Sequence, residues 1–417
     1  MLLPRIVPRA RAAMFLAGAL ALSCNAVKKE PAVVVPVYPE KLAITKAESL
    51  RTGIGAKSVE MSPDGSRVYS MNLEECSVYE YNRASRVIQR KLIFVMTPGK
   101  GWDYDKKVPI NSYQEKPVEG HFSHNGRYLW VSLHNADGVA VWDLLGGDTA
   151  VEGKPFKTAW LHERIPPKPA DVSAPPAAKK KAAPEPEFTN KKMKLLLIKT
   201  GATPKVIWSS PNGKYLFVSN WHSSTVSVID ISAPTPDGWN VVKTLRTGSV
   251  PRGMTASADS KFLYIAQMGG NFLSVVDLDT VEKVREITVG PAPRHILISN
   301  GYLYASICNE AKLIKVELPS GRIVQWARTM SSPRTIAASP DGTVIFVTCY
   351  NDNTVQAFRA DTLALLATRE SPGRPVGITV WQGGGVYEAW ICNHTNFVMN
   401  VFTYTPPPAG SGTPPRQ

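Results

Sequence analysis

The sequence predicts an all-β chain that folds as a seven-bladed β-propeller, closed by an N-terminal strand that completes the last blade. The first observation is a recurring unit of apolar strand, Asn-Gly or Asp-Gly turn and second apolar strand, clearest over 210–230. Such turns favour hairpins because both residues tolerate positive φ. The second observation is the period. The turns at 213, 260, 301, 342 and 385 are spaced by 47, 41, 41 and 43 residues, which is typical of four-stranded propeller blades.

The strand before each turn is expected to be the innermost strand of its blade. An aromatic-rich second strand follows each turn, then a polar loop, a third strand and, in complete units, a fourth strand. One such unit cannot bury its own faces, so the copies must pack side by side. The expected innermost strands cover 59–62, 120–123, 206–210, 253–257, 295–299, 335–339 and, in weaker form, 376–381.

The first residues predict export. Residues 1–24 contain three arginines and then an apolar run over 12–22, which is too short for a membrane span and typical of a signal peptide. The segment before Cys24 resembles a bacterial lipobox, which predicts that Cys24 is the lipidated first residue of the mature chain. An ordinary cleaved signal is the alternative. Residues 25–40 are expected to be a flexible tether to the outer membrane or periplasm, with the cell surface as a further option.

The propeller is expected to span 41–404. Residues 49–53 (SLRTG) nearly repeat 244–248 (TLRTG), the end of a fourth strand, although no earlier strand of a blade precedes them. The seventh repeat stops after its third strand and is followed by the Pro-rich stretch 405–417, an expected disordered tail. The two incomplete ends should therefore pair, so that no edge is left open at the closure.

Two insertions interrupt the period. Residues 97–116 join the first two blades on the face where the innermost strands begin, which we call the start face. Residues 146–190 lie between the third and fourth strands of blade 2, on the opposite face. Because the middle of this insertion is rich in Pro, Ala and Lys, we expect 146–190 to be disordered.

The chain has 48 Lys and Arg against 34 Asp and Glu, a net charge of +14, which favours anionic partners without specifying one. Cysteines other than Cys24 could form disulfides if the chain is exported, because disulfides persist in oxidising compartments. Equivalent points of neighbouring blades are, however, farther apart than a disulfide can span. We therefore expect these four thiols to be mostly free and buried: Cys76, Cys308, Cys349 and Cys392.

A cation follows Pro at the head of the innermost strand in four consecutive blades, and Arg374 directly precedes Pro375. Two such charges about 10 Å apart repel by roughly 0.4 kcal/mol in water and about 1.7 kcal/mol at an effective dielectric of 20. The pattern therefore predicts a basic arc that binds an anion, with pairing to loop carbonyls or acids as the alternative. The four cations are Lys205, Arg252, Arg294 and Arg334.

Loops after the second strands are expected on the same start face. Aromatic, amide and basic side chains around one concavity are typical of a site for a polar or anionic molecule. Loop tips are also polar simply because they contact solvent, and ordinary solvent-exposed loops are the alternative interpretation. The expected rim consists of Trp102, Tyr104, His134, Trp221, His222, Met268, Asn309, Tyr350, Asn351, Asn393 and His394, with His295 beside Arg294.

No motif requires catalysis. The sequence lacks Cys-x-x-Cys-His, Gly-x-Ser-x-Gly, a phosphate loop and a paired-carboxylate cluster. The histidines, among them His121 and His124, show no metal-ligand spacing. We expect no metal and no cofactor; a non-enzyme is favoured, and an enzyme is kept as the alternative.

The second strands Phe217-Val218-Ser219-Asn220 and Phe346-Val347-Thr348-Cys349 resemble the motif of YVTN-type seven-bladed propellers. The segments 116–120, 125–131 and 251–254 are similar to exported propellers of spirochaete surface antigens and related envelope proteins. This resemblance implies surface exposure and partner binding.

The leading hypothesis is a non-catalytic, monomeric envelope lipoprotein. It would bind a small anionic or polar ligand, or an envelope or host macromolecule, at the channel mouth, and contact a membrane only through its lipid. One alternative, from related propellers, is an enzyme with a lactonase-like or d1-haem-type channel site. Another is single-stranded nucleic-acid binding on the basic face, which predicts steep salt dependence.

Overall fold

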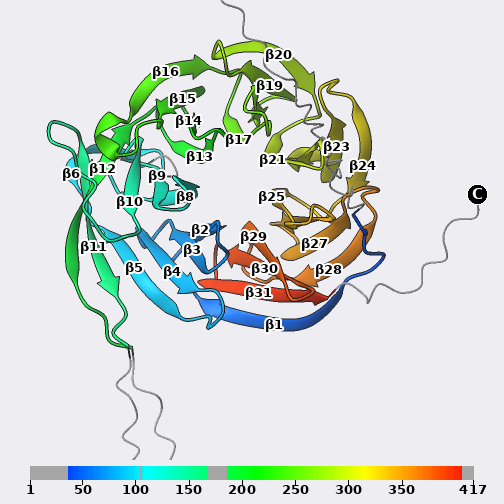
Figure 1. Ribbon diagram of the computed structural model, residues 1–417, viewed down its shortest axis with the longest axis horizontal. Coiled ribbons are helices and arrows are strands. Elements are labelled where there is room, and N and C mark those ends of the chain that lie inside the picture. The colour runs from blue at the N-terminus through cyan, green and yellow to red at the C-terminus, as the bar shows by residue number, and fades with distance from the viewer. Residues whose placement is uncertain (1–35, 104–105, 167–185, 406–417) are drawn as a thin grey trace, which may run out of the picture. The chain divides into compact units, whose positions relative to one another are not determined.

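The computed structural model describes residues 36–103, 106–166 and 186–405, which form small antiparallel sheets around a common axis (Figure 1). The helices in this part of the chain are two single turns of 3-10 helix, Pro236–Gly238 and Cys308–Glu310. No helix among these residues is long and apolar enough to cross a membrane. Several predicted features lie outside the described residues. They are the signal peptide 1–24 with Cys24, the tether up to residue 35, Tyr104, the insertion segment 167–185 and the tail 406–417.

Four sheets consist of four consecutive strands, as the repeat predicts. Their strands are β13 (Pro204–Ser209), β14 (Tyr215–Asn220), β15 (Thr225–Asp230), β16 (Asn240–Arg246); β17 (Pro251–Ala256), β18 (Phe262–Gln267), β19 (Phe272–Asp277), β20 (Glu282–Thr288); β21 (Pro293–Ser299), β22 (Tyr302–Ile307), β23 (Lys312–Glu317), β24 (Ile323–Arg328); β25 (Pro333–Ala338), β26 (Val344–Cys349), β27 (Thr354–Arg359) and β28 (Leu365–Glu370).

The first part of the chain departs from this regularity. A nine-stranded sheet contains β2 (Ala56–Met61), β3 (Arg67–Asn72), β4 (Ser77–Asn82), β5 (Ile88–Phe94), β8 (Pro117–Ser123), β9 (Tyr128–Leu133), β10 (Gly138–Asp143), β11 (Phe156–Glu163) and β12 (Lys191–Lys199). The insertion 97–116 forms a separate hairpin of β6 (Pro98–Asp103) and β7 (Val108–Ser112).

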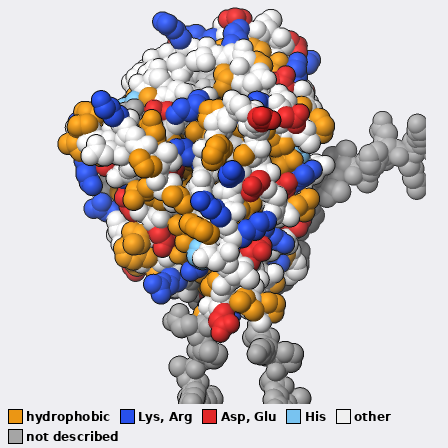
Figure 2. Space-filling view, turned by 90° about the vertical axis from the view of Figure 1, so that its left-hand side faces the viewer, with side chains coloured by type: hydrophobic (Ala, Val, Ile, Leu, Met, Phe, Trp, Pro, Cys, Tyr) orange, Lys and Arg blue, Asp and Glu red, His pale blue; other side chains and the backbone are white. Residues whose placement is uncertain are grey.

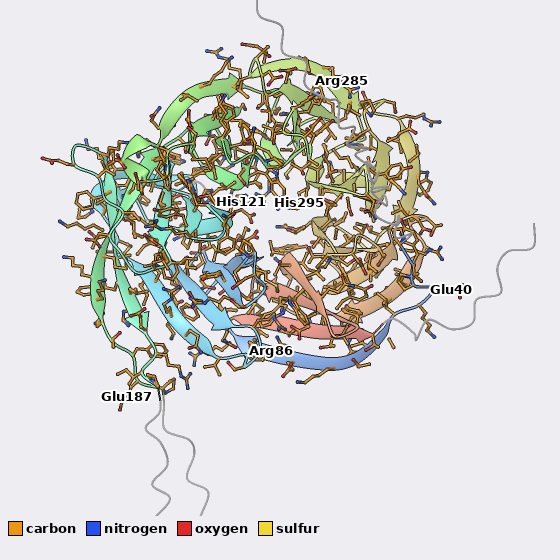
Figure 3. All side chains as sticks on the ribbon, in the orientation of Figure 1. Glu40, Arg86, His121, Glu187, Arg285 and His295 are labelled. Atoms are coloured by element: carbon orange, nitrogen blue, oxygen red, sulfur yellow. The ribbon has the colours of Figure 1, made fainter. Side chains whose placement is uncertain are left out.

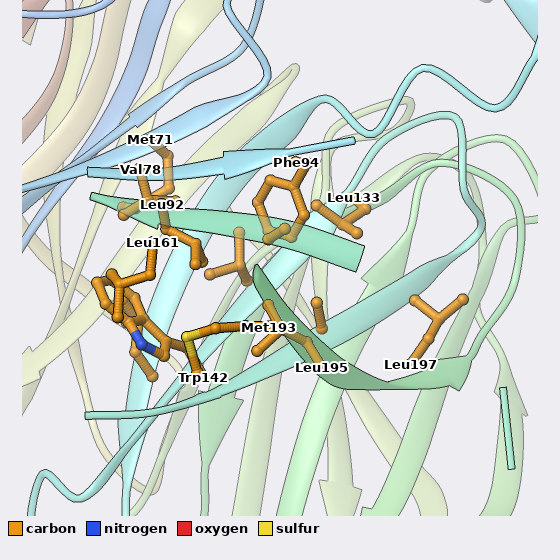
Figure 4. Close-up of a cluster of buried hydrophobic side chains, with 14 of the residues drawn as sticks. Met71, Val78, Leu92, Phe94, Leu133, Trp142, Leu161, Met193, Leu195 and Leu197 are labelled. Carbon is orange, nitrogen blue, oxygen red and sulfur yellow. The ribbon is translucent and has the colours of Figure 1, made fainter. Parts of the chain in front are cut away.

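The added strand β11 joins two blades into the nine-stranded sheet. It pairs antiparallel with β5 on one side and with β12 on the other. Its buried residues alternate along the strand, and Leu161 packs with Leu92, Trp142 and Met193 in one apolar core (Figure 4). The structure thus differs from the expectation of disorder over 146–190. Alternation with one buried face is the pattern of a strand, and it is present within the Pro- and Lys-rich insertion.

The innermost strands contact one another in chain order: β2 with β8, then β13, β17, β21, β25 and β29, and β29 in turn contacts β2. The last sheet contains β29 (Pro375–Gly383), β30 (Val386–Asn393) and β31 (Val398–Thr405), with β1 (Ala43–Arg51) as its outermost strand. β1 pairs antiparallel with β31 from Ala43 opposite Thr405 to Arg51 opposite Val398. The first and last described strands are therefore neighbours in one sheet (Figure 1).

The turn between the first two strands of a blade shows why the repeat is so regular. The Ser210 hydroxyl donates to Asn212 Oδ1 at 2.7 Å and accepts the Tyr215 N–H at 2.9 Å. Gly213 has a φ of 71°, which favours glycine. Because these bonds are local, the turn forms from its own residues and sets the hairpin register.

A buried ion pair attaches the insertion 97–116 to β11. Lys157 Nζ lies 2.8 Å from Glu115 Oε1, and the two side chains are 5% and 0% exposed. Glu115 also accepts the backbone N–H of Thr97. Since a buried charge is stable only when it is paired, this contact fixes the position of the insertion.

We expect Glu115→Gln to lower the free energy of unfolding by about 3–5 kcal/mol, because the buried Lys157 ammonium loses its carboxylate. The double variant Glu115→Leu/Lys157→Met should lose less, since no unpaired charge remains. Urea unfolding measures both values. A single variant no less stable than the double variant would contradict this assignment.

Candidate functional site

Each of the four Pro-initiated strands that carry the basic arc has a register shift just after its first residue. The shifts lie between Pro204 and Ile207, Pro251 and Met254, Pro293 and Ile296, and Pro333 and Ile336. The arc cation is the first of the two residues inside each shift. Its backbone therefore leaves the regular ladder at the start face.

Hydroxyl groups of the second strands bridge these register shifts to the next blade. The Ser219 hydroxyl accepts the Val206 N–H of its own blade at 3.0 Å and donates to the Arg252 carbonyl of the next blade at 3.0 Å. Ser132, Ser306 and Thr348 do the same toward Lys205, Arg334 and Val376. The hydroxyl thus satisfies the N–H that the shift leaves unpaired and fixes the backbone of the following arc residue.

Six charged residues from the inner strands form what we call the axial cluster. Burial lowers the pKa of Lys57, and the charges of Arg334, Arg294 and Arg252 lower it further. Lys57 and these three arginines lie on four different inner strands, β2, β17, β21 and β25. Their charges act on the pKa of Lys57 because the side chains converge toward the common axis of the sheets. The cluster consists of Lys57, Glu119, Lys205, Arg252, Arg294 and Arg334.

The arginines of the axial cluster have fewer partners than their donors require. Arg252 Nη2 lies 3.3 Å from Glu119 Oε1, whereas its buried Nε and Nη1 have no hydrogen-bond partner among the described residues. Arg294 Nη1 lies 3.4 Å from the thioether Sδ of Met268. Burial and the charges of Arg252 and Arg334 lower the pKa of Arg294 well below its ordinary value. These guanidinium groups are therefore buried, close together and underpaired.

Arg334 stacks on an aromatic ring of the rim. Its guanidinium carbon lies 3.4 Å from the centroid of Tyr350, and that of the exposed Arg374 lies 5.4 Å from the same ring. The buried Nε of Arg334 also has no partner in the described part of the chain. Tyr350 thus holds two cations of the arc by cation–π attraction while leaving donors available.

Lys205 contacts the imidazole of His134 and the ring of Trp221. Its Nζ lies 3.1 Å from His134 Nε2 and 4.5 Å from the Trp221 ring centroid. Burial, followed by the charge of Lys205, lowers the pKa of His134. His134 is therefore a neutral acceptor for the buried lysine.

The remaining predicted histidines lie near the start-face ends of the inner strands. Burial and then the charges of Arg252 and Arg294 lower the pKa of His295 to about 3. Burial and then Lys57 lower that of His394 to about 4. His222 is exposed, and its Nδ1 lies 2.7 Å from the Thr203 hydroxyl. Figure 3 shows His121 and His295 beside the axis on the inner strands.

Two predicted rim residues are not brought to this site. Trp102 is 43% exposed on β6, which Figure 1 places at the periphery near β12 rather than beside the inner strands. Asn393 is fully buried and bonds to the Ser371 hydroxyl and the Val398 carbonyl, so it holds its own blade together. Exposure and position in the loop cannot be read from the repeat alone.

Two residues of the axial cluster, Lys57 and Glu119, and the neighbouring acid Glu60 were not among the predicted site residues. Lys57 occupies the arc position of β2, but Ala56 stands where other blades have Pro. Glu119 pairs with Arg252 of a non-adjacent blade. Burial and then the charge of Glu119 raise the pKa of Glu60 to about 8. Lys57 lies two residues before the predicted strand 59–62, and extending that strand by two residues would have found it.

The four described cysteines are free thiols, as expected, although Cys76 and Cys308 are only partly buried. Burial raises the pKa of Cys349 and of Cys392 to about 12, so both are unreactive thiols at neutral pH. In the described ranges, no group of three or more His, Cys, Asp or Glu could hold a metal ion.

Lys57 provides a pH test of the axial cluster. Its pKa falls from 10.5 to about 7, so between these values the unfolded chain binds more protons than the folded chain. Stability from this residue should therefore increase as the pH rises from 7 to 9, by at most about 1.4 kcal/mol per unit. Urea unfolding of the wild type and Lys57→Met should show this difference. A difference that stays constant or falls with pH would contradict the convergence of charges.

No protein-family model and no curated protein sequence matches the chain. Among solved structures, the β-propeller domain of Cps50 (Swd1) from Myceliophteria thermophila is similar. The TM-score is 0.60 and the identity 12%, over 85% of this chain and 99% of that domain. At this identity the similarity shows the fold alone, which is an all-β propeller.

Proposed function

We propose that the chain is a YVTN-type, seven-bladed propeller whose axial cluster binds a small oxyanion. The cyclic contacts of β2, β8, β13, β17, β21, β25 and β29 support seven blades, and the pairing of β1 with β31 supports closure by the N-terminal strand. The same proposal includes export, lipidation at Cys24 and a place in the bacterial envelope. Support for these comes from the sequence of residues 1–24 and its resemblance to exported propellers.

The single observation that carries the binding proposal is the set of unpaired guanidinium donors. Nε and Nη1 of Arg252 and Nε of Arg334 are buried without partners among the described residues. An unsatisfied buried donor costs about 1–3 kcal/mol, more when it is charged. Oxyanions such as phosphate or carboxylate accept paired N–H groups from arginine and would satisfy these donors.

Charge balance favours the same ligand. Among the described residues, Glu119 is the one carboxylate that forms an ion pair with an arginine of the axial cluster, and its partner is Arg252. The raised pKa of Glu60 makes that acid a poor source of negative charge at neutral pH. In the described part of the chain, Glu119 is therefore the one ionised acid found beside the three arginines of the axial cluster, and a bound oxyanion would reduce the repulsion between these arginines.

The protein's role would then be non-catalytic recognition. Arg374, Tyr350 and His222 lie at the rim with exposed or partly exposed side chains, where they could contact the rest of a larger anionic molecule. A ligand group would enter the axial cluster while its remainder stays at the start face. This arrangement suits a small anion or the anionic group of an envelope macromolecule.

Inorganic phosphate serves as the first probe. We expect phosphate at about 10 mM to raise the Tm of the wild type relative to chloride of equal ionic strength, because ligand binding to the folded state stabilises it. The variant Arg294→Gln/Arg334→Gln should lose this increase. Without phosphate it should be at least as stable as the wild type, since two repelling buried charges are removed.

The matched control is Arg328→Gln/Arg369→Gln, which removes two exposed arginines from outer strands. It should keep the phosphate response of the wild type. The proposal fails if phosphate, pyrophosphate and citrate all leave the Tm of the wild type unchanged, or if both double variants respond equally.

A further inference from the structure

A second site lies at the outside of the molecule, between the end of β1 and the strand β5. A groove with a volume of about 940 Å³ is lined by Arg51, Tyr79, Lys91, Arg164 and Phe188 among others. Its size is within the range of ligand-binding clefts. The antiparallel bridge between Arg164 and Phe188, two residues within the second insertion, supplies one wall. In Figure 3, Arg86 and Glu187 mark the two sides of this region.

The groove is more basic than its own acids can balance. Arg51, Lys91 and Arg164 form no ion pair within the described residues, whereas Arg86 is paired with Glu48 and Glu388. The one lining acid, Glu75, accepts hydrogen bonds from the Ser77 and Tyr79 hydroxyls. Three cations therefore face the groove without a carboxylate partner, which favours an acidic occupant.

Aromatic and aliphatic groups lie between and beyond these cations. Lys91 Nζ lies 4.7 Å from the Tyr79 ring centroid and 5.1 Å from that of Phe188. At one end, Ile54 and Phe397 are 49% and 43% exposed. Figure 2 shows the adjoining side of the molecule, where Lys, Arg, Asp and Glu side chains are interspersed with hydrophobic ones. The occupant must therefore present apolar groups as well as negative charge.

The third feature of the groove is the open backbone edge of β1 beside it. β1 is the outermost strand of its sheet, and its edge away from β31 pairs with no described strand. From Lys46 to Arg51 the strand has a regular register, and the Tyr81 hydroxyl fixes its end by donating to the Arg51 carbonyl at 2.8 Å. An open, regular edge beside a groove is suited to the addition of another strand.

We propose that this groove binds an extended acidic peptide of a partner protein, which adds as a strand to the edge of β1. Acidic side chains of the peptide face Arg51, Lys91 and Arg164. Apolar side chains of the same peptide contact the exposed Ile54 and Phe397 at the end of the groove. The proposal is independent of anion binding at the axial cluster, because the two sites share no residue.

The test uses the purified protein and fluorescein-labelled peptides of alternating Val with Asp and Glu. We expect a rise in fluorescence anisotropy with the acidic peptide and none with the version that has Lys in place of each acid. A third peptide keeps the acids but has Pro in place of Val, which removes the N–H groups that a strand needs. It should bind at least about tenfold more weakly if strand addition holds the peptide.

Lys91→Gln/Arg164→Gln should weaken binding of the acidic peptide at least about tenfold. Arg51→Gln, at an exposed position, should weaken binding of this peptide without affecting the fold. The matched control Lys261→Gln/Arg328→Gln, and Arg294→Gln in the axial cluster, should bind as the wild type does. No binding of the acidic peptide, equal binding of the Lys peptide, or equal binding of the Pro peptide would each overturn the proposal. Binding of dodecanoate but not of the acidic peptide would also overturn it and point to an anionic amphiphile.

Discussion

The site depends on one hydrogen-bonded arrangement, the second-strand hydroxyl that joins two blades. Ser132, Ser219, Ser306 and Thr348 each accept an N–H from the register shift of their own blade and donate to a carbonyl of the next. Neighbouring inner strands are thereby fixed relative to one another by directional bonds as well as by packing. Three of these carbonyls belong to Lys205, Arg252 and Arg334, so the bonds that align the blades also place the cations.

This arrangement holds charges together that would otherwise separate. The like charges of Arg252, Arg294 and Arg334 repel one another, and burial lowers the pKa of Arg294 and of Arg334. Packing of the inner strands supplies the free energy that keeps them in place, because the side chains cannot move apart without disturbing several blades. Residues kept in an unfavourable environment by the surrounding fold are typical of functional sites.

Much of the fold could be predicted from the sequence because its signals are local. The turn at 210–213 and the Pro-Arg steps at 251–252, 293–294 and 333–334 lie within a few residues of the groups they position. The strand β11 was not predicted, because its partners β5 and β12 belong to different blades and its pattern is short within a Pro-rich insertion. Lys57 was missed since Ala56 replaces the marker Pro, and Trp102 was misplaced because the path of an inserted hairpin is not set by the repeat.

The most direct measurement is the position of an oxyanion in a crystal soaked with selenate, whose anomalous scattering identifies it. The account predicts a peak within hydrogen-bonding distance of the Arg252 and Arg334 guanidinium groups, with Arg294 or Lys57 as a further neighbour. Selenate bound only elsewhere, with Arg252 Nε and Nη1 and Arg334 Nε bonded to protein groups instead, would contradict it.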